Sequence, residues 1–454
     1  MRLSTRSGRA GDTVGAASLN WQQRADERGL HIGIIGLGYV GLPLALLFSE
    51  AGFRVTGFDI DAEKVARLNT GGSYIYRIEP VQIAAALRSG FHATADFASI
   101  ADVDAVLICV PTPLGDDHTP DIRAILSTMD SIVPHLHEGQ LVVLESTTYP
   151  GTTTEVVAPK IEAAGRCIAK NGAEEGVLIA FSPEREDPGN TAIARAEIPK
   201  VVGGMSEQAG AAAAAVYGSI FKRIVRVSTP EAAEMTKLLE NIYRNVNIAL
   251  VNELKLLCLR MGIDVWEVID AAATKPFGFQ PFYPGPGLGG HCIPVDPFYL
   301  SWRAKQFGFN TRFIELAGEV NEAMPRHVLD TLTAALQARG TALAGAKVLV
   351  LGVAYKKDVD DLRESPALVI IEMLQQGGAV VRYNDPFFPR VGSGRKYDLQ
   401  MESAPLAEFA AYDCVLIVTD HSAYDYRLIV AESRLVVDTR NATRGIDSPK
   451  IIRC

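Results

Sequence analysis

Apolar residues in this 454-residue chain gather into short continuous runs that are separated by helix-length stretches. Between 31 and 61 the pattern is an apolar strand, a glycine-rich turn, a helix and a second strand. Further apolar strands lie at the start of 104–115, 141–153 and 177–186, and each one ends in polar residues. Short buried strands that alternate with helices are typical of a parallel α/β sheet.

A glycine turn follows the first strand, where Gly36, Gly38 and Gly41 form a GxGxxG pattern. In this strand–helix frame the first glycine allows a tight turn, the second lets a pyrophosphate approach the backbone, and the third allows close packing of helix on strand. The second strand ends in Asp59, whose carboxylate can accept both ribose hydroxyls and would repel a 2′-phosphate. The pattern predicts dinucleotide binding, with NAD favoured over NADP. Lys64 fits either a solvated surface position or a contact with the adenosine ribose.

A long helical pattern occupies 228–262, with a proline in its first turn and Gly262 at its end. About 32 helical residues span roughly 48 Å, which is long enough to bridge two domains. Lys237, Asn241 and Asn245 recur at i, i+4 and i+8 and therefore share one face of a mostly apolar helix. The stripe could be a solvated face, but a buried lysine or asparagine needs partners, so on this mostly apolar helix it predicts a Lys/Asn pair that donates hydrogen bonds to a developing oxyanion in a cleft.

The last part of the chain repeats the strand–loop–helix–strand pattern over 345–387 without a GxGxxG. The predicted fold class is α/β, with two Rossmann-like parallel-sheet domains joined by a long central helix. The expected division is a disordered N-terminal extension, an NAD-binding domain, a central helical domain with a cysteine loop, and a C-terminal UDP-sugar-binding domain, over 1–30, 31–227, 228–325 and 326–454.

Composition limits the function classes. The formal charge of −9 argues against a general binder of nucleic acid or membrane surfaces. No run approaches the roughly 20 apolar residues of a membrane span, and residues 1–30 lack the apolar region of a secretory signal. The six cysteines are far apart, with no zinc-like spacing, so we expect a reduced cytoplasmic protein without a metal.

The segment PGPGLGGHCIPVDPFYL at 284–300 places Cys292 among four glycines and four prolines, with Asp296 four residues further on. A single alcohol oxidation needs only a base and a hydride acceptor. Oxidation through to an acid needs capture of the aldehyde, which a cysteine achieves as a thiohemiacetal that then yields a thioester. Beside a dinucleotide site, Cys292 is therefore the expected nucleophile of a four-electron oxidation.

From about residue 31 to 445 the chain resembles the UDP-glucose/GDP-mannose dehydrogenase family. The motifs that carry the resemblance are GLGYVGLPLA, VPTP, ESTTYPGTT, FSPER, EMTKLLENIYRNVNIALVNE, GPGLGGHCIPVDP and GVAYKKDVDDLRESPA. The cysteine segment, with FGFQPFYP before it, resembles the subgroup that oxidises UDP-N-acetylhexosamines, UDP-N-acetylglucosamine above all. The UDP-glucose enzymes more often carry other residues at the positions of His291 and Val295.

The resemblance implies a role for each matched position. Cys292 would be the covalent nucleophile, Lys237 and Asn241 would stabilise oxyanions, and Lys237 would also relay protons. Asp296 with Thr147 and a water would transfer protons, and Glu184 would line the sugar pocket and assist thioester hydrolysis. The implied NAD contacts are Gly36, Gly38, Tyr39, Val40, Gly41, Asp59, Lys64, Val110, Thr112, Ser146, Thr147 and Arg363. The implied substrate contacts are Glu184, Arg185, Lys237, Asn241, Tyr283, Gly285, Gly287, Gly289, Lys356 and Arg440.

Rival functions stay open at this point. UDP-glucose, UDP-ManNAc or UDP-GalNAc could replace UDP-GlcNAc, with the product feeding surface polysaccharides such as O-antigen or capsule. Cys292 could be structural in a two-electron dehydrogenase, or the chain could be an inactive nucleotide-sugar-binding regulator. The apolar faces of the long helix predict a homodimer or a higher homo-oligomer.

Overall fold

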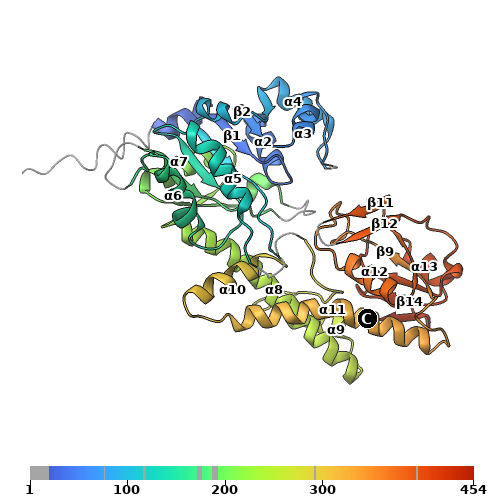
Figure 1. The fold of residues 1–454 in the computed structure, drawn as a ribbon. Coiled ribbons are helices and arrows are strands. Elements are labelled where there is room, and N and C mark those ends of the chain that lie inside the picture. The colour runs from blue at the N-terminus through green and yellow to red at the C-terminus, as the bar shows by residue number, and fades with distance from the viewer. Residues whose placement is uncertain are drawn as a thin grey trace, which may run out of the picture. The chain divides into compact units, whose positions relative to one another are not determined.

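The computed structural model describes residues 20–75, 77–115, 119–170, 176–186, 193–290, 293–394 and 397–454. The chain divides into two compact units, Met1–Glu240 and Asn241–Cys454, and helix α8 (Pro230–Met261) runs through the boundary between them (Figure 1). The observed helix agrees closely with the predicted pattern at 228–262. Two α/β units joined by a long helix confirm the predicted fold class.

An eight-stranded sheet forms the centre of the first unit, in the order β3-β2-β1-β4-β5-β6-β7-β8. All neighbouring strands are parallel except β6 and β7. Because the strand order reverses direction between β1 and β4, loops on either side of this switch point diverge and leave a crevice where dinucleotides bind in such sheets. The strands are His31–Ile35, Arg54–Phe58, Phe91–Thr94, Ala105–Ile108, Leu141–Leu144, Leu178–Phe181, Lys200–Gly204 and Ile224–Val227.

Helices cover both faces of this sheet because its central strands are buried on both sides. Ile34 points into a core shared with α2, α4 and α7, whereas Ile35 points into a core shared with α5 and α6. In chain order the helices are α2 (Gly41–Glu50), α3 (Ala62–Asn69), α4 (Pro80–Arg88), α5 (Arg123–Ile132), α6 (Ala158–Ala163) and α7 (Glu207–Gly218).

The predicted disordered extension over 1–30 is wrong for its last part. Residues 20–26 form a helix, and Trp21 and Ala25 are buried in the core of the first unit. Two apolar residues four positions apart lie on the same side of a helical turn, which is sufficient to dock an otherwise polar segment. Residues 1–19 lie outside the described residues.

The second unit contains a five-stranded parallel sheet in the order β10-β9-β13-β14-β15, with its own switch point between β9 and β13. Helices α11 and α12 pack on one face of this sheet and α13 on the other. The strands are Lys347–Leu351 (β9), Val380–Asn384 (β10), Cys414–Ile417 (β13), Val436–Asp438 (β14) and Ile451–Arg453 (β15), with a separate pair Arg390–Ser393 (β11) and Asp398–Glu402 (β12). The helices are α9 (Val265–Ala273), α10 (Asp296–Gln306), α11 (Arg312–Gln337), α12 (Pro366–Gln376) and α13 (Tyr426–Glu432).

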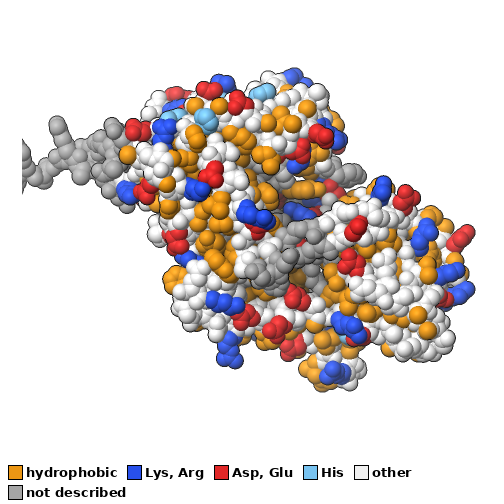
Figure 2. Space-filling view, in the orientation of Figure 1, with side chains coloured by type: hydrophobic (Ala, Val, Ile, Leu, Met, Phe, Trp, Pro, Cys, Tyr) orange, Lys and Arg blue, Asp and Glu red, His pale blue; other side chains and the backbone are white. Residues whose placement is uncertain are grey.

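Charged side chains of both signs are interspersed on the surface shown in Figure 2. This mixture agrees with the modest net charge of −9 and shows no single basic tract on that face. Among the residues that the structure describes, no helix has both the length and the apolar character that crossing a membrane requires.

Candidate active site

The glycine turn after β1 has the geometry that its sequence predicts. Gly36 has a φ of 88°, a conformation that other residues rarely adopt. A Cβ on Gly41 would lie 1.9 Å from the Gly36 carbonyl oxygen, so helix α2 can pack this closely on the strand only with glycine. Around Gly38 there is no atom within 4 Å of an added Cβ, which leaves the backbone open to a ligand. The turn therefore fits a dinucleotide pyrophosphate.

Asp59 lies at the end of β2 and joins the glycine turn to that strand. Its Oδ2 accepts a hydrogen bond from the Leu37 N–H (2.9 Å), and its Oδ1 accepts one from the Asp61 N–H (3.0 Å). An ionised carboxylate has further lone pairs, so ribose hydroxyls can still bind there. Lys64 lies 3.6 Å from the Asp61 carboxylate and above the ring of Tyr74, and its predicted ribose contact stays a prediction.

Two further predicted NAD contacts, Tyr39 and Val40, lie in the glycine turn. Tyr39 is 47% exposed, and Val40 directly precedes helix α2.

Loops after β4 and β5 are tied together at the same edge of the first sheet. The Ser146 hydroxyl donates to the Val110 carbonyl oxygen (2.7 Å), and the Thr112 hydroxyl donates to the Thr147 carbonyl oxygen (2.7 Å). The structure thus brings together four of the predicted NAD contacts beside the switch point. Their contacts with the cofactor stay predictions.

Glu184 follows β6 at this edge and carries a buried charge. Its Oε1 accepts hydrogen bonds from the next two backbone N–H groups (2.8 and 2.7 Å). Its Oε2 is buried and has no hydrogen-bond partner within the described part of the chain. Burial alone would raise the pKa of Glu184, but the nearby charges of Lys200, Arg195 and Lys237 outweigh it and hold the pKa below its usual value.

Lys237 is 4% exposed, and the described residues offer its ammonium no hydrogen-bond partner. The ammonium is therefore available to hydrogen bond to a ligand oxygen. Arg185 differs, because its guanidinium already donates to the Glu240 carboxylate and to the Pro199 carbonyl oxygen. These contacts give Arg185 a structural role in addition to its predicted substrate contact.

Sequence reasoning missed the ion pair that supports Glu184. The Lys200 ammonium contacts the Glu145 carboxylate at 2.7 Å and the Pro183 carbonyl oxygen at 3.1 Å, directly before Glu184. Tyr217 donates its hydroxyl to the other Glu145 oxygen (2.5 Å). Glu145, one of the polar residues that end the strand in 141–153, is 2% exposed and lies in the core. The signal available in the sequence was a lysine at the first position of an otherwise apolar strand.

In the second unit, Asn241 donates its side-chain amide to Oδ2 of Asp296, the first residue of α10. Asp296 is 2% exposed, so this bond holds a carboxylate inside the protein. The expected nucleophile Cys292 and its neighbour His291 lie outside the described residues. The role of Cys292 as nucleophile is therefore a proposal.

The glycine loop before Cys292 packs against the second sheet's loops. A Cβ on Gly285 would lie 2.5 Å from the Arg440 guanidinium, and one on Gly289 would lie 2.6 Å from the Tyr355 side chain. These glycines therefore have a packing role that ligand approach alone does not explain. The Gly290 N–H also donates to the Arg363 carbonyl oxygen (2.9 Å).

Two further loop residues were predicted to contact substrate. Gly287 has a φ of 136°, and a Cβ there would lie 3.1 Å from Pro366. Tyr283 stacks on Trp266 and donates its hydroxyl to Asp270 (2.8 Å).

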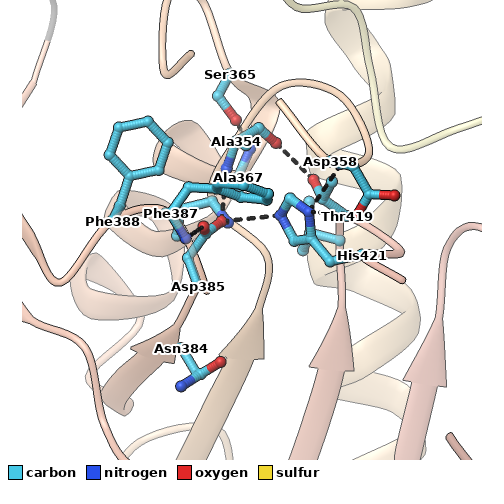
Figure 3. A network of polar contacts seen from close by, with 12 residues as sticks. Ala354, Asp358, Ser365, Ala367, Asn384, Asp385, Phe387, Phe388, Thr419 and His421 are labelled. Carbon is cyan, nitrogen blue, oxygen red and sulfur yellow. Dashed lines mark hydrogen bonds and ion pairs between the residues drawn. The ribbon is translucent and has the colours of Figure 1, made fainter. Parts of the chain in front are cut away.

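A polar network occupies the switch point of the second sheet (Figure 3). Oδ2 of Asp385 accepts from the N–H groups of Val353 and Ala354 (2.7 and 3.0 Å) and contacts Nε2 of His421 (3.0 Å). Nδ1 of His421 accepts from the Asp358 N–H (3.0 Å), so Nε2 carries the proton and donates to Asp385.

This network fixes the loop after β9, where half-buried Lys356 and the Arg363–Asp361 ion pair (2.6 Å) lie. Gly352, with a φ of 81°, and Asp385 repeat the arrangement of glycine and aspartate found in the first sheet. The second unit is thus a second nucleotide-binding fold whose loop carries cations.

A parallel sheet with an open glycine turn, an acid at the end of its second strand, and a buried lysine and glutamate at the same edge define an NAD-dependent dehydrogenase. Comparison with family models specifies it further. The chain matches the NAD binding, central and UDP binding domains of the UDP-glucose/GDP-mannose dehydrogenase family at residues 30–221, 231–323 and 349–445. The chain belongs to this family of nucleotide-sugar dehydrogenases.

Curated relatives match along most of the chain. A UDP-N-acetyl-D-mannosamine dehydrogenase of Salmonella typhi is 35% identical over 434 residues, which cover 91% of this chain and 99% of the relative. A UDP-N-acetyl-D-glucosamine 6-dehydrogenase of Pseudomonas aeruginosa is 32% identical over 400 residues, covering 87% and 91%.

Among solved structures, the UDP-D-ManNAc dehydrogenase of Pyrococcus horikoshii has a TM-score of 0.81 at 32% identity and covers 92% of this chain and 97% of its own. A UDP-glucose dehydrogenase of Pyrobaculum islandicum has a TM-score of 0.80 at 27% identity, covering 93% and 96%.

Proposed function

We propose that this protein oxidises the C6 hydroxymethyl group of a UDP-N-acetylhexosamine to the carboxylate, with UDP-N-acetylglucosamine as the first candidate. The observation that carries the proposal is the Lys237 ammonium, which has no hydrogen-bond partner among the described residues and whose charge helps to lower the pKa of Glu184. A cation in this setting stabilises an alkoxide or a tetrahedral oxyanion at C6.

The reaction balances as two oxidations and one hydrolysis. When bound, NAD supplies the hydride acceptor for each oxidation. The first oxidation removes a hydride from C6 and a proton from its hydroxyl, leaving an aldehyde. The Cys292 sulfur then bonds to that carbon, and the resulting thiohemiacetal loses a second hydride and a proton to leave a thioester. Water adds to the thioester, the C–S bond breaks, and the carboxylate leaves with the thiol restored.

Other residues of the site would transfer protons and stabilise the oxyanion. Lys237 can relay the hydroxyl proton, because its ammonium can hydrogen bond to the substrate oxygen, release one of its own protons to water and then take up the proton of the hydroxyl. Glu184, held ionised by its neighbours, is suited to accept a proton from the hydrolytic water. Asp296 and Thr147 serve in proton transfer through a water, and Asn241 adds an oxyanion contact.

The nucleotide would bind to the second unit. Loop 283–289 would hold the sugar nucleotide, Lys356 would contact its phosphates, and Arg440 would contact the uridine side. Arg363 would extend toward the cofactor. The product is a nucleotide-linked uronic acid, which suits a transferase that builds surface polysaccharides.

UDP-N-acetylmannosamine is the second candidate substrate. The names of several relatives at 35 to 36% identity favour it, whereas the cysteine segment favours the glucosamine compound. A panel of UDP-GlcNAc, UDP-ManNAc, UDP-GalNAc and UDP-glucose, assayed for NAD reduction, separates them by kcat/KM. A clear preference for UDP-glucose would contradict the N-acetylhexosamine assignment and leave the chemistry intact.

Cofactor stoichiometry tests the mechanism. The wild type should form two NADH per sugar oxidised, and Cys292→Ser should stop after one, because a serine hydroxyl captures the aldehyde poorly. Cys167→Ser is the matched control, since Cys167 is exposed and belongs to none of the motifs of the site. Two equivalents of NADH from Cys292→Ser would refute covalent capture.

A further inference from the structure

The polar stripe on helix α8 continues past Asn245 to a further buried asparagine. Asn245 and Asn252 are 2% and 0% exposed, and Asn321 of helix α11 is 2% exposed. Burying three carboxamides has a desolvation cost in free energy that burying aliphatic side chains does not have. Hydrogen bonds within the protein are needed to offset this cost.

These three side chains form a chain of hydrogen bonds with one direction. The Gly285 N–H donates to Oδ1 of Asn252 (3.0 Å), and Nδ2 of Asn252 donates to Oδ1 of Asn321 (2.9 Å). Nδ2 of Asn321 donates to the carbonyl oxygen of Asn245 (3.2 Å) and lies 3.4 Å from its Oδ1. Nδ2 of Asn245 then donates to the Ile293 carbonyl oxygen (3.1 Å).

Backbone groups at the two ends fix the orientation of every amide. An N–H at Gly285 requires an oxygen of Asn252, which turns the Asn252 NH₂ toward Asn321. The carbonyl oxygen of Ile293 in turn requires the NH₂ of Asn245. Flipping any one amide would set donor against donor or acceptor against acceptor. In a low-dielectric interior, hydrogen bonds that are linked in one direction polarise and strengthen one another, so the three amides act as a unit.

Both ends of this series of hydrogen bonds lie on the same loop. Gly285 opens the segment 285–293 and Ile293 closes it, and Ile293 is bonded directly to Cys292. The segment is rich in glycine and would lose much conformational entropy on ordering. Two helices thus clamp the loop from its two ends.

We propose that Asn252, Asn321 and Asn245 are positioning residues that hold the loop of Cys292 in its reactive arrangement. This inference rests on the proposed function of Cys292, and it assigns the asparagines no contact with the reacting atoms. They act through the backbone at 285 and 293.

The test compares Asn252→Leu, Asn245→Leu and the double variant with wild-type enzyme. Leucine is close in size to asparagine but removes the amide. Asn247→Leu is the matched control, because Asn247 lies on the same helix and, among the described residues, its side chain donates only to the Tyr243 carbonyl oxygen (2.7 Å).

Each protein is assayed for kcat and KM with the UDP-sugar, for NAD affinity, for melting temperature, and for the alkylation rate of Cys292 by iodoacetamide with peptide mapping. Loss of positioning should lower kcat and change the alkylation rate while NAD affinity stays unchanged. A displacement of about 1 Å lowers rates by about 100-fold, which sets the expected size.

The double variant distinguishes a clamp from independent packing. Sites two helical turns apart without a shared partner usually add in free energy, but one linked chain broken at either end should lose little more when broken at both. Folded variants with wild-type kcat and alkylation rate, or with fully additive losses, would overturn the inference.

Hydrogen exchange on the wild type requires no variant and covers the case in which a variant does not fold. The Gly285 amide should exchange slowly, because a buried side chain accepts its hydrogen bond. Exchange as fast as in an exposed loop would overturn the inference. A wild-type enzyme that forms only one NADH per sugar would instead refute the proposed function, so the two failures are distinguishable.

Discussion

The buried ion pair between Lys200 and Glu145 gives a prediction whose size follows from the structure. The two side chains are 3% and 0% exposed, and their charged atoms lie 2.7 Å apart. Lys200→Met would leave the Glu145 carboxylate buried without its cation, and breaking such a pair costs about 3–5 kcal/mol. Whole domains are stable by about 5–15 kcal/mol, so the variant should be close to unfolding under mild conditions.

Urea unfolding measures this loss, with two companion variants. Lys200→Met with Glu145→Gln removes both charges and should recover part of the stability, because no buried charge is then left unpaired. Lys222→Met is the control: Lys222 pairs with Glu197 at 2.5 Å, but both are exposed, and such surface pairs contribute about 0–1 kcal/mol. A loss below about 1 kcal/mol for Lys200→Met, or a double variant less stable than the single one, would refute the reasoning.

Lys200→Met should also change the pH dependence of activity. Burial alone would raise the pKa of Glu184, and Lys200 is the strongest of the charges that hold it below its usual value. Without Lys200 the pKa of Glu184 should rise, so the acidic limb of the kcat profile should move to higher pH. An unmoved limb would show that Glu184 does not act as the base in hydrolysis.

Two further predictions concern the glycine turn and the start of α8. Gly38→Ala should fold normally, because the space around Gly38 is open, but it should bind NAD more weakly. Gly41→Ala should lose NAD binding and also about 1–3 kcal/mol of stability, because its Cβ overlaps the Gly36 carbonyl oxygen. Equal stability of the two variants in urea would contradict this. Burial raises the pKa of Glu234 to about 7, above the 4.5 of the unfolded chain, so its stabilising contribution is complete below pH 4.5 and is lost as the pH rises through about 7. Across that window the wild type should lose about 3 kcal/mol relative to Glu234→Gln, and a difference independent of pH would contradict the raised pKa.

Local chemistry explains which elements could be predicted. The turn at Gly36 needs a positive φ, and close helix packing needs Gly41, so the residue types themselves carry the signal. Helix α8 could be predicted because its start and end signals and its apolar periodicity all lie within one continuous segment. The helix over 20–26 was missed because only Trp21 and Ala25 in a polar segment mark its buried face.

Contacts between distant segments explain what could not be predicted. Lys200 and Glu145 are 55 residues apart, and Asn252 and Asn321 are 69 apart. The residues next to Lys200 or Asn252 in the sequence do not indicate the partner of that side chain, because strand order and helix packing determine which distant residue lies beside it.

Sequence alone determined the two nucleotide-binding folds, the glycine turn and the long helix, because these depend on backbone conformations and periodicities that neighbouring residues set. Only the tertiary structure decided which buried charges and amides meet: Lys200 with Glu145, His421 with Asp385, and the three asparagines with the two ends of one loop. A buried polar group must find a partner, but the fold, through the register of its sheets and the packing of its helices, selects which partner is within hydrogen-bonding distance.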